Sequence, residues 1–142
     1  MQSYRFLSIA LFVLLWGCNP ATIVELENNT SGELEVTVFY SSVQEIPEEA
    51  LEEANEVSFT IPAGECRSFS RDCDDIQAVK VDADVDLGGG LGPSNDTGVF
   101  RDGSHFGCGD VLHFTFTATI APPELTINFD QRDATEVSTD CN

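Results

Sequence analysis

Three aspartates at alternate positions are the residues whose type and spacing most directly suggest chemistry. Asp82, Asp84 and Asp86 are separated by single apolar residues, so a strand would place all three carboxylates on one face. Ca²⁺ takes about six to eight oxygen ligands, and such a row could supply some of them. An EF-hand-like loop, however, would need Gly in place of Leu87 and Glu in place of Pro93. The pattern therefore favours the solvated face of a strand, with a calcium site as the alternative.

A second group combines the residue types of copper centres. His105, Cys108 and His113 lie close together in the sequence, and blue-copper sites draw His and Cys ligands from such groups. No methionine follows Met1 to serve as an axial ligand, and Cys108 is better explained by a disulfide. A histidine facing outward from a strand is the simpler interpretation of His113.

Motifs of known catalytic sites do not occur in the sequence. There is no Gly-x-Ser-x-Gly elbow and no His-Glu-x-x-His pair. The acidic pair Glu48 and Glu49 falls on a predicted exposed helix, whereas a glycosidase acid needs an apolar pocket to raise its pKa. We therefore expect no catalytic residue and no cofactor other than the possible calcium. An enzyme of unrecognised type is the weakest alternative.

Length and charge restrict the class of protein further. A chain of 142 residues suits one domain, and 42% hydrophobic residues are enough to form a core. The 25 acidic residues exceed the 6 basic ones, which gives a formal net charge of −19. Phosphate binding requires a basic surface, so the composition argues against nucleic acid as a partner.

The first 17 residues differ from the rest of the chain. Arg5 is their only charged residue, and the apolar run 6–16 is interrupted only by Ser8. This run is too short for a transmembrane helix, which needs roughly 20 apolar residues. A short basic start followed by such a run is typical of a secretory signal peptide, which we assign to residues 1–17.

The end of this segment carries a more specific motif. Leu15-Trp16-Gly17-Cys18 resembles the lipobox of bacterial lipoproteins, although the family usually has a smaller residue in place of Trp16. The resemblance implies cleavage after Gly17 and lipidation of Cys18, which would make residues 18–22 a short lipidated tether to the bilayer. Because Asn19 rather than Asp follows the cysteine, the resemblance favours the outer membrane. Cleavage removes Arg5 and no acidic residue, so 5 basic and 25 acidic residues give the mature chain a charge of −20.

Four cysteines remain after Cys18, and an even number in an exported protein indicates two disulfides. Cys73 and Cys108 each stand a few residues before an expected strand. If those strands start at the same end of the fold, Cys73 pairs with Cys108 and Cys66 pairs with Cys141. A bond between Cys66 and Cys73, closing a short loop, is the alternative.

Alternation of apolar and polar residues predicts a mainly β domain over residues 23–142, with a polar C-terminal tail. The expected strands are 23–27, 34–40, 57–61, 66–70, 76–87, 112–120 and 125–129. The turn-forming segment 28–32 predicts that the first two strands form a hairpin. Good helix formers at 47–55 predict one short helix, and the long loop 88–110 is the expected location of function. About seven or eight short strands in this length indicate an antiparallel β-sandwich.

These observations together predict a non-catalytic, membrane-anchored lipoprotein of the cell envelope. We expect it to act as a structural or protein-interaction module, with the lipid bilayer and an envelope protein as partners. A calcium-dependent binding or adhesion domain that uses Asp82, Asp84 and Asp86 is the alternative.

Overall fold

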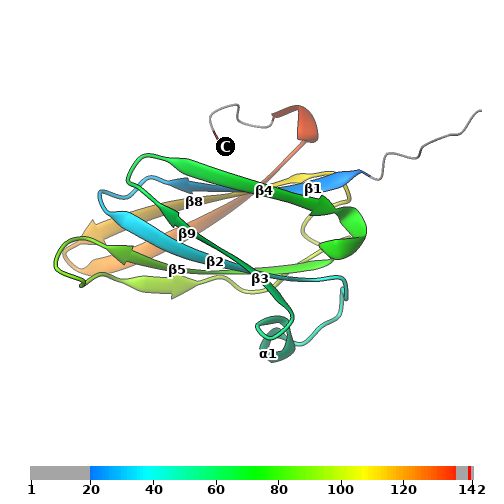
Figure 1. Cartoon of the computed structure of the whole chain (residues 1–142), viewed down its shortest axis with the longest axis horizontal. Coiled ribbons are helices and arrows are strands. Elements are labelled where there is room, and N and C mark those ends of the chain that lie inside the picture. The colour runs from blue at the N-terminus through cyan, green and yellow to red at the C-terminus, as the bar shows by residue number, and fades with distance from the viewer. Residues whose placement is uncertain (1–19, 137–140, 142) are drawn as a thin grey trace, which may run out of the picture.

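A computed structural model describes residues 20–136 and 141 of the chain. The expected signal peptide and the lipidation site Cys18 lie outside these residues. The described part is a mainly β sandwich of two sheets, and it contains no helix that is long and apolar enough to cross a membrane (Figure 1).

The first sheet has the strand order β4-β1-β8-β9. Its strands are β1 (Ala21–Asn28), β4 (Cys66–Asp72), β8 (Val111–Ile120) and β9 (Pro123–Arg132). Neighbouring strands are antiparallel except β1 and β8, which run in the same direction.

The second sheet has the order β3-β2-β5-β6, with the two-residue β7 also paired to β5. Its strands are β2 (Glu33–Ser41), β3 (Asn55–Ile61), β5 (Ala78–Asp86), β6 (Ser94–Asp96) and β7 (Phe100–Arg101). All of its pairings are antiparallel. The predicted β-sandwich is thus confirmed, with nine described strands because β6 and β7 occupy part of the expected long loop 88–110.

The core lies between the sheets and consists of the apolar residues of each alternating strand. Leu26 of β1 and Phe114 and Phe116 of β8 face Val36 and Val81 of the second sheet, and none is more than 1% exposed. Their burial removes the apolar face of each strand from water, which is the main driving force for packing two sheets together.

The predicted hairpin between the first two strands is wrong, because β1 and β2 belong to different sheets. The side chain of Asn28 stabilises the crossing: its Nδ2 donates to the carbonyls of Gly32 at 2.9 Å and Ile61 at 2.8 Å. Its Oδ1 accepts the backbone N–H of Thr30 at 2.9 Å. The turn-rich segment therefore carries the chain from one sheet to the other.

The helix is shorter than expected. Within the segment 47–55 only α1 (Glu48–Leu51) is helical, and β3 already begins at Asn55. Two short 3-10 helices, Cys73–Asp75 and Ala134–Glu136, occur elsewhere in the described residues. Leu51 is fully buried and holds the helix against the second sheet, while Glu48 and Glu52 pair with Lys80 of β5.

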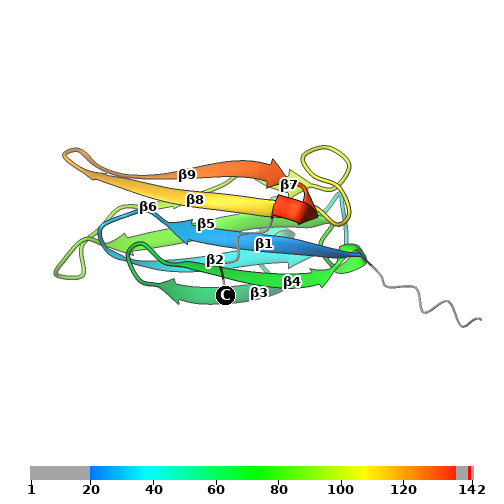
Figure 2. The ribbon, with the colours of Figure 1, turned by 90° about the horizontal axis from the view of Figure 1, so that it is seen from above.

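The two ends of the sandwich differ. The described chain begins at one end, where the backbone N–H of Cys73 donates to the carbonyl of Pro20 at 3.1 Å; we call this the tether end. The β8–β9 turn and the loop after β5 lie together at the opposite end, which we call the distal end (Figure 2).

Candidate functional site

An apolar groove of about 410 Å³ opens at the distal end. Leu87, Leu91 and Pro93 from the loop after β5 line one side, and Ile120 at the end of β8 and Pro123 at the start of β9 line the other. Leu91 is 79% exposed and Ile120 is 74% exposed, although both are large aliphatic residues. Two such side chains beside one groove form an apolar surface of the kind that marks interaction sites.

Glycines shape the loop that forms one wall of this groove. Gly89 and Gly90 have φ angles of 72° and 73°, in the left-handed region that other residues rarely adopt. A Cβ atom at Gly92 would fall against the carbonyl oxygen of Val85, so only glycine lets the loop pass so close to β5.

A row of carboxylates lies beside the apolar groove. Glu33 of β2 stands opposite Asp86 of β5, and Glu35 stands opposite Asp84. These four side chains line a second groove of about 370 Å³, and Gly92 borders both grooves. We call these four residues the carboxylate row. Within the described part of the chain, no Lys, Arg or His forms an ion pair with any of them.

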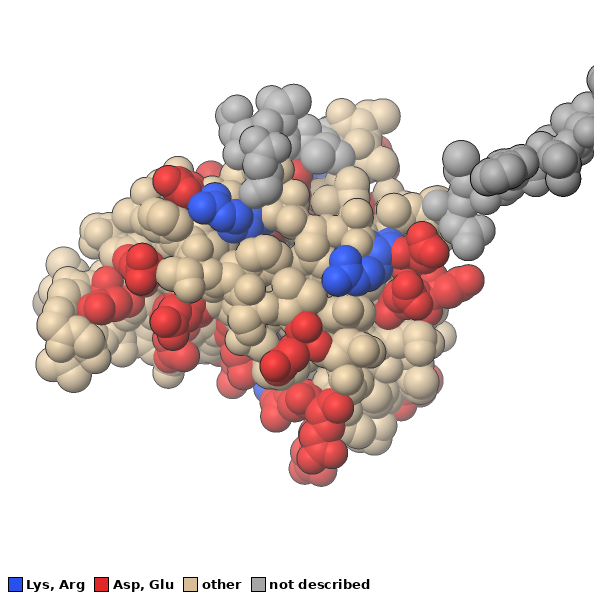
Figure 3. Space-filling model, viewed as in Figure 1, with Lys and Arg blue, Asp and Glu red and all other residues tan. Residues whose placement is uncertain are grey.

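The surface of the molecule shows the same division (Figure 3). The extremity of the distal end carries no charged side chain in this view, and acidic side chains lie next to it. The distal end thus combines an uncharged apolar tip with a strongly acidic flank.

The calcium candidates share the outer face of β5, as predicted, but they have different surroundings. Asp82 lies 3.8 Å from Lys80 and opposite Asp96, whereas Asp84 is opposite Glu35. Asp86 accepts hydrogen bonds from two backbone N–H groups of the glycine loop, at 2.8 and 3.2 Å. No group of three or more acidic, His or Cys side chains that could hold a metal ion occurs among the described residues. Calcium binding at Asp82, Asp84 and Asp86 therefore stays a prediction.

The charges around Lys80 shift two pKa values. Burial lowers the pKa of Lys80, but hydrogen bonds to Glu52 and Glu48 and the nearby charge of Asp82 outweigh it, so this pKa is raised above its ordinary value. Burial raises the pKa of Asp82, and the charge of Asp96 adds to the rise while Lys80 opposes it. The surroundings of Lys80 therefore favour its protonated form, and those of Asp82 disfavour its ionised form.

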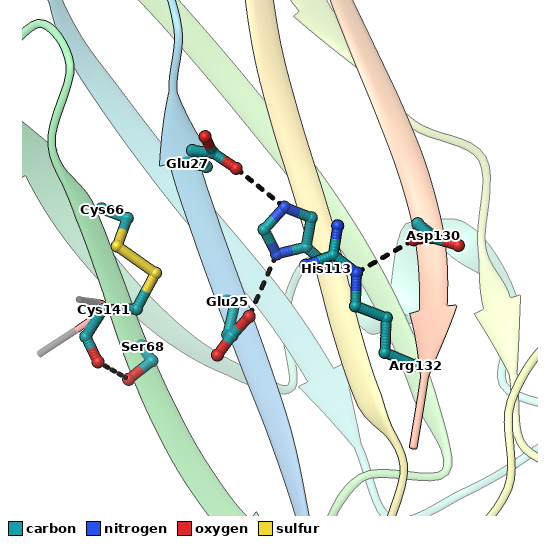
Figure 4. Close-up of polar contacts among 8 residues, drawn as sticks. All are labelled: Glu25, Glu27, Cys66, Ser68, His113, Asp130, Arg132 and Cys141. Atoms are coloured by element: carbon teal, nitrogen blue, oxygen red, sulfur yellow. Dashed lines mark hydrogen bonds and ion pairs between the residues drawn. A yellow bond between two sulfur atoms is a disulfide. The ribbon is translucent and has the colours of Figure 1, made fainter. Parts of the chain in front are cut away.

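A second polar cluster crosses the outer face of the first sheet (Figure 4). His113 of β8 lies between two carboxylates of β1: its Nδ1 is 3.1 Å from Glu25 and its Nε2 is 2.9 Å from Glu27. The side chains of His113 and Glu25 are only 3% and 0% exposed. Both ring nitrogens are engaged, so the imidazole has no free nitrogen to act on a substrate. This arrangement indicates a structural role.

Sequence reasoning missed this cluster because His113 and Glu25 are 88 residues apart. The only available signal was the pair Glu25 and Glu27, which are two residues apart and so project from the same face of a strand. The parallel register, with Glu25 opposite His113, was not visible in the sequence.

The four cysteines form the favoured pairs. The structure joins Cys73 to Cys108 and Cys66 to Cys141, with Cα–Cα distances of 5.1 and 4.9 Å. The second bond fixes the C-terminal tail to β4, where Ser68 Oγ donates to the carbonyl of Cys141 at 3.1 Å. The bond between Cys73 and Cys108 lies at the tether end, because each cysteine stands a few residues before a strand that runs toward the distal end.

The copper candidates do not form a common site in the structure. Cys108 is in a disulfide, His113 is held by two glutamates, and His105 Nδ1 accepts the backbone N–H of Arg101 at 3.0 Å. The segment 88–110, expected to be one long functional loop, is divided by β6 and β7. Its first part reaches the distal end and its last part reaches the tether end.

Comparison with known proteins supports the fold alone. No family model and no curated protein sequence matches the chain. A protein from Eubacterium rectale solved by NMR is similar with a TM-score of 0.51 and 11% identity, over 77% of this chain and 87% of that one. The type VI secretion lipoprotein TssJ1 of Pseudomonas aeruginosa has a TM-score of 0.40 and 13% identity, over 79% and 97%. The human-specific toxin intermedilysin has a TM-score of 0.46 and 8% identity over 79% of this chain, which spans 24% of the toxin.

Proposed function

We propose that this protein is a lipid-anchored, non-catalytic module of the cell envelope that binds another protein through its distal end. One observation carries the proposal: the exposed apolar groove lies at the end of the sandwich opposite to Pro20, two residues beyond the expected lipidation site Cys18. An anchored domain with this geometry offers its apolar surface to the space beyond the bilayer.

The length of the strands supports this orientation. β8 has 10 residues and runs from the tether end to Ile120. At about 3.3 Å per residue it spans roughly 30 Å. The groove would therefore stand several Debye lengths, each about 8 Å at physiological salt, from a bilayer that touches the tether end.

A non-catalytic role is supported by the state of the buried polar groups. His113 and Glu25 are engaged with each other, and Lys80 is surrounded by carboxylates. None of these groups lines the distal groove, whose lining consists of leucine, isoleucine, glycine and proline residues.

Anchoring is tested by metabolic labelling with a radioactive fatty acid. The lipobox resemblance leads us to expect label in the wild type and none in Cys18→Ser, with the wild type in the outer-membrane fraction. Equal labelling of both proteins would refute the anchor.

Partner binding is tested by placing a photocrosslinking amino acid at Ile120 in cells. A matched probe at Glu56, an exposed residue of β3 that stands opposite Phe39 and away from the distal end, serves as the control. We expect crosslinked products from position 120 and not from position 56. Equal products at both positions, or none at 120, would refute binding through the distal end.

A further inference from the structure

We infer that the distal groove binds a basic amphipathic protein segment, whose apolar side chains enter the groove while its Lys or Arg side chains meet the carboxylate row. The inference rests on the proposed function, because it assigns a chemistry to the partner of the same surface. It excludes a bilayer, a second copy of the chain and an acidic partner as the occupant.

The apolar half of this surface requires an apolar occupant. Leu91 and Ile120 are both more than 70% exposed, on opposite walls of the groove. Leu87 is partly buried against the core, whereas Leu91 and Ile120 leave most of their side-chain surface in contact with solvent. Aliphatic side chains of a partner would cover them and release the water at their surface.

The carboxylate row determines which charge an apolar occupant of the groove must carry. Glu33 opposite Asp86 and Glu35 opposite Asp84 are like charges directly across two strands, an arrangement that repels. A cationic segment would relieve this repulsion, whereas an anionic bilayer or a second copy of a chain with charge −20 would increase it. The row and the groove meet at Gly92, so one continuous segment can reach both.

The backbone around the groove is already fixed in place. Gly92 is confined against Val85, and Asp86 Oδ1 accepts the N–H groups of Gly88 and Gly90. A surface held in this way loses little conformational freedom when a partner binds, which favours affinity.

The experiment measures fluorescence anisotropy of three labelled 12-residue peptides added to the lipidated protein in nanodiscs of neutral lipid. One peptide is composed of Lys and Leu, one of Glu and Leu, and one of Lys and Ser. We expect the Lys/Leu peptide to bind about tenfold or more tightly than the other two, because only it satisfies both halves of the surface.

Variants assign the binding to the distal end. Leu91→Ser with Ile120→Ser removes the apolar walls, and Glu35→Gln with Asp84→Asn removes half of the carboxylate row. Each pair should weaken Lys/Leu binding about tenfold, and the second should also reduce its dependence on salt. All four residues are exposed or on the solvent side, so the variants should fold, as far-UV circular dichroism would verify.

A charge-matched control separates specific binding from general attraction to an acidic protein. Glu49→Gln with Glu56→Gln removes the same charge from exposed residues outside both distal grooves, and binding should be unchanged. Equal weakening by this control, or equal binding of the Glu/Leu peptide, would overturn the inference. The inference would also be overturned if the protein dimerised in sedimentation experiments, or bound anionic vesicles, and Leu91→Ser with Ile120→Ser abolished that association. Crosslinking from position 120 to a partner without a basic apolar segment would overturn the inference and leave the proposed function standing.

Discussion

The outer faces of the two sheets differ in how far their carboxylates are paired with cationic or histidine side chains. On the first sheet, Glu25 and Glu27 meet His113, and Asp130 meets Arg132 at 2.9 Å. On the second sheet, Lys80 pairs with Glu48 and Glu52, which lie at α1. The carboxylate row at the distal end has no cation among the described residues.

This difference distinguishes carboxylates that stabilise the fold from carboxylates that can bind a partner. Charges that are paired within the chain contribute to folding and have little left to offer a partner. Charges left unpaired and exposed oppose folding slightly and remain available for binding. Substitutions on the two faces should therefore change the free energy of unfolding by different amounts.

Removing the disulfide of the first face should have the largest effect. Cys66→Ala with Cys141→Ala opens a bond that spans 75 residues. For a loop of this size, the loop-entropy relation gives about 4.5 kcal/mol of unfolding free energy. Urea unfolding followed by circular dichroism would measure the loss, with Cys73→Ala plus Cys108→Ala as the comparison. That bond spans 35 residues, for which the same relation gives about 3.8 kcal/mol. A loss below about 1 kcal/mol for either pair would contradict this account.

Removing the imidazole of His113 should cause the second-largest loss of stability. His113→Ala leaves the fully buried Glu25 without its ring partner, and breaking such a buried pair costs about 3 kcal/mol. Glu27 is 40% exposed, so Glu27→Gln should lower the unfolding free energy by only about 0.5 kcal/mol. Equal losses for the two variants would show that burial of the pair is not what matters.

Lys80 is the corresponding cation of the second face, and its partners are more exposed. Lys80→Met keeps the buried stem and removes the charge, so we expect a loss of about 1 kcal/mol at pH 7. Because the pKa of Lys80 is raised in the folded protein, its contribution is complete below the ordinary lysine pKa and is lost as the pH rises through the folded value. The difference between wild type and Lys80→Met should therefore shrink in strongly alkaline urea titrations. A difference that grew with pH would contradict the assignment.

Asp82 should show the smallest effect, with the opposite sign. Its pKa is raised by burial, so the ionised carboxylate disfavours folding above the ordinary aspartate pKa. Asp82→Asn should raise the melting temperature slightly at pH 7, and the gain should vanish as the pH falls below that ordinary value. The effect is small because the side chain is 44% exposed. Asp130→Asn on the first face removes a paired carboxylate and should give no such gain.

The arrangement of the cysteines was largely predictable from sequence. Cys73 and Cys108 each precede a strand by a few residues, and two strands that start at one end bring such residues together. The alternation in β5 and β8 likewise identified the buried Val81 and Phe114. The distal groove was not predictable in the same way, because Leu91 and Ile120 are 29 residues apart in the sequence, and nothing local indicates that the loop after β5 meets the end of β8.

The alternation of apolar and polar residues was enough to identify the buried face of each strand and a sandwich fold, and residues 15–18 resemble a lipobox. Which strands are neighbours was visible only in the folded chain, where β1 and β2 belong to different sheets and β1 pairs in parallel with β8. The physical reason is that alternation records contact with the core, which depends on side chains. Pairing between strands is made by backbone hydrogen bonds, which are the same for almost every residue. His113 between its two glutamates, and the carboxylate row beside the apolar groove, follow from that pairing.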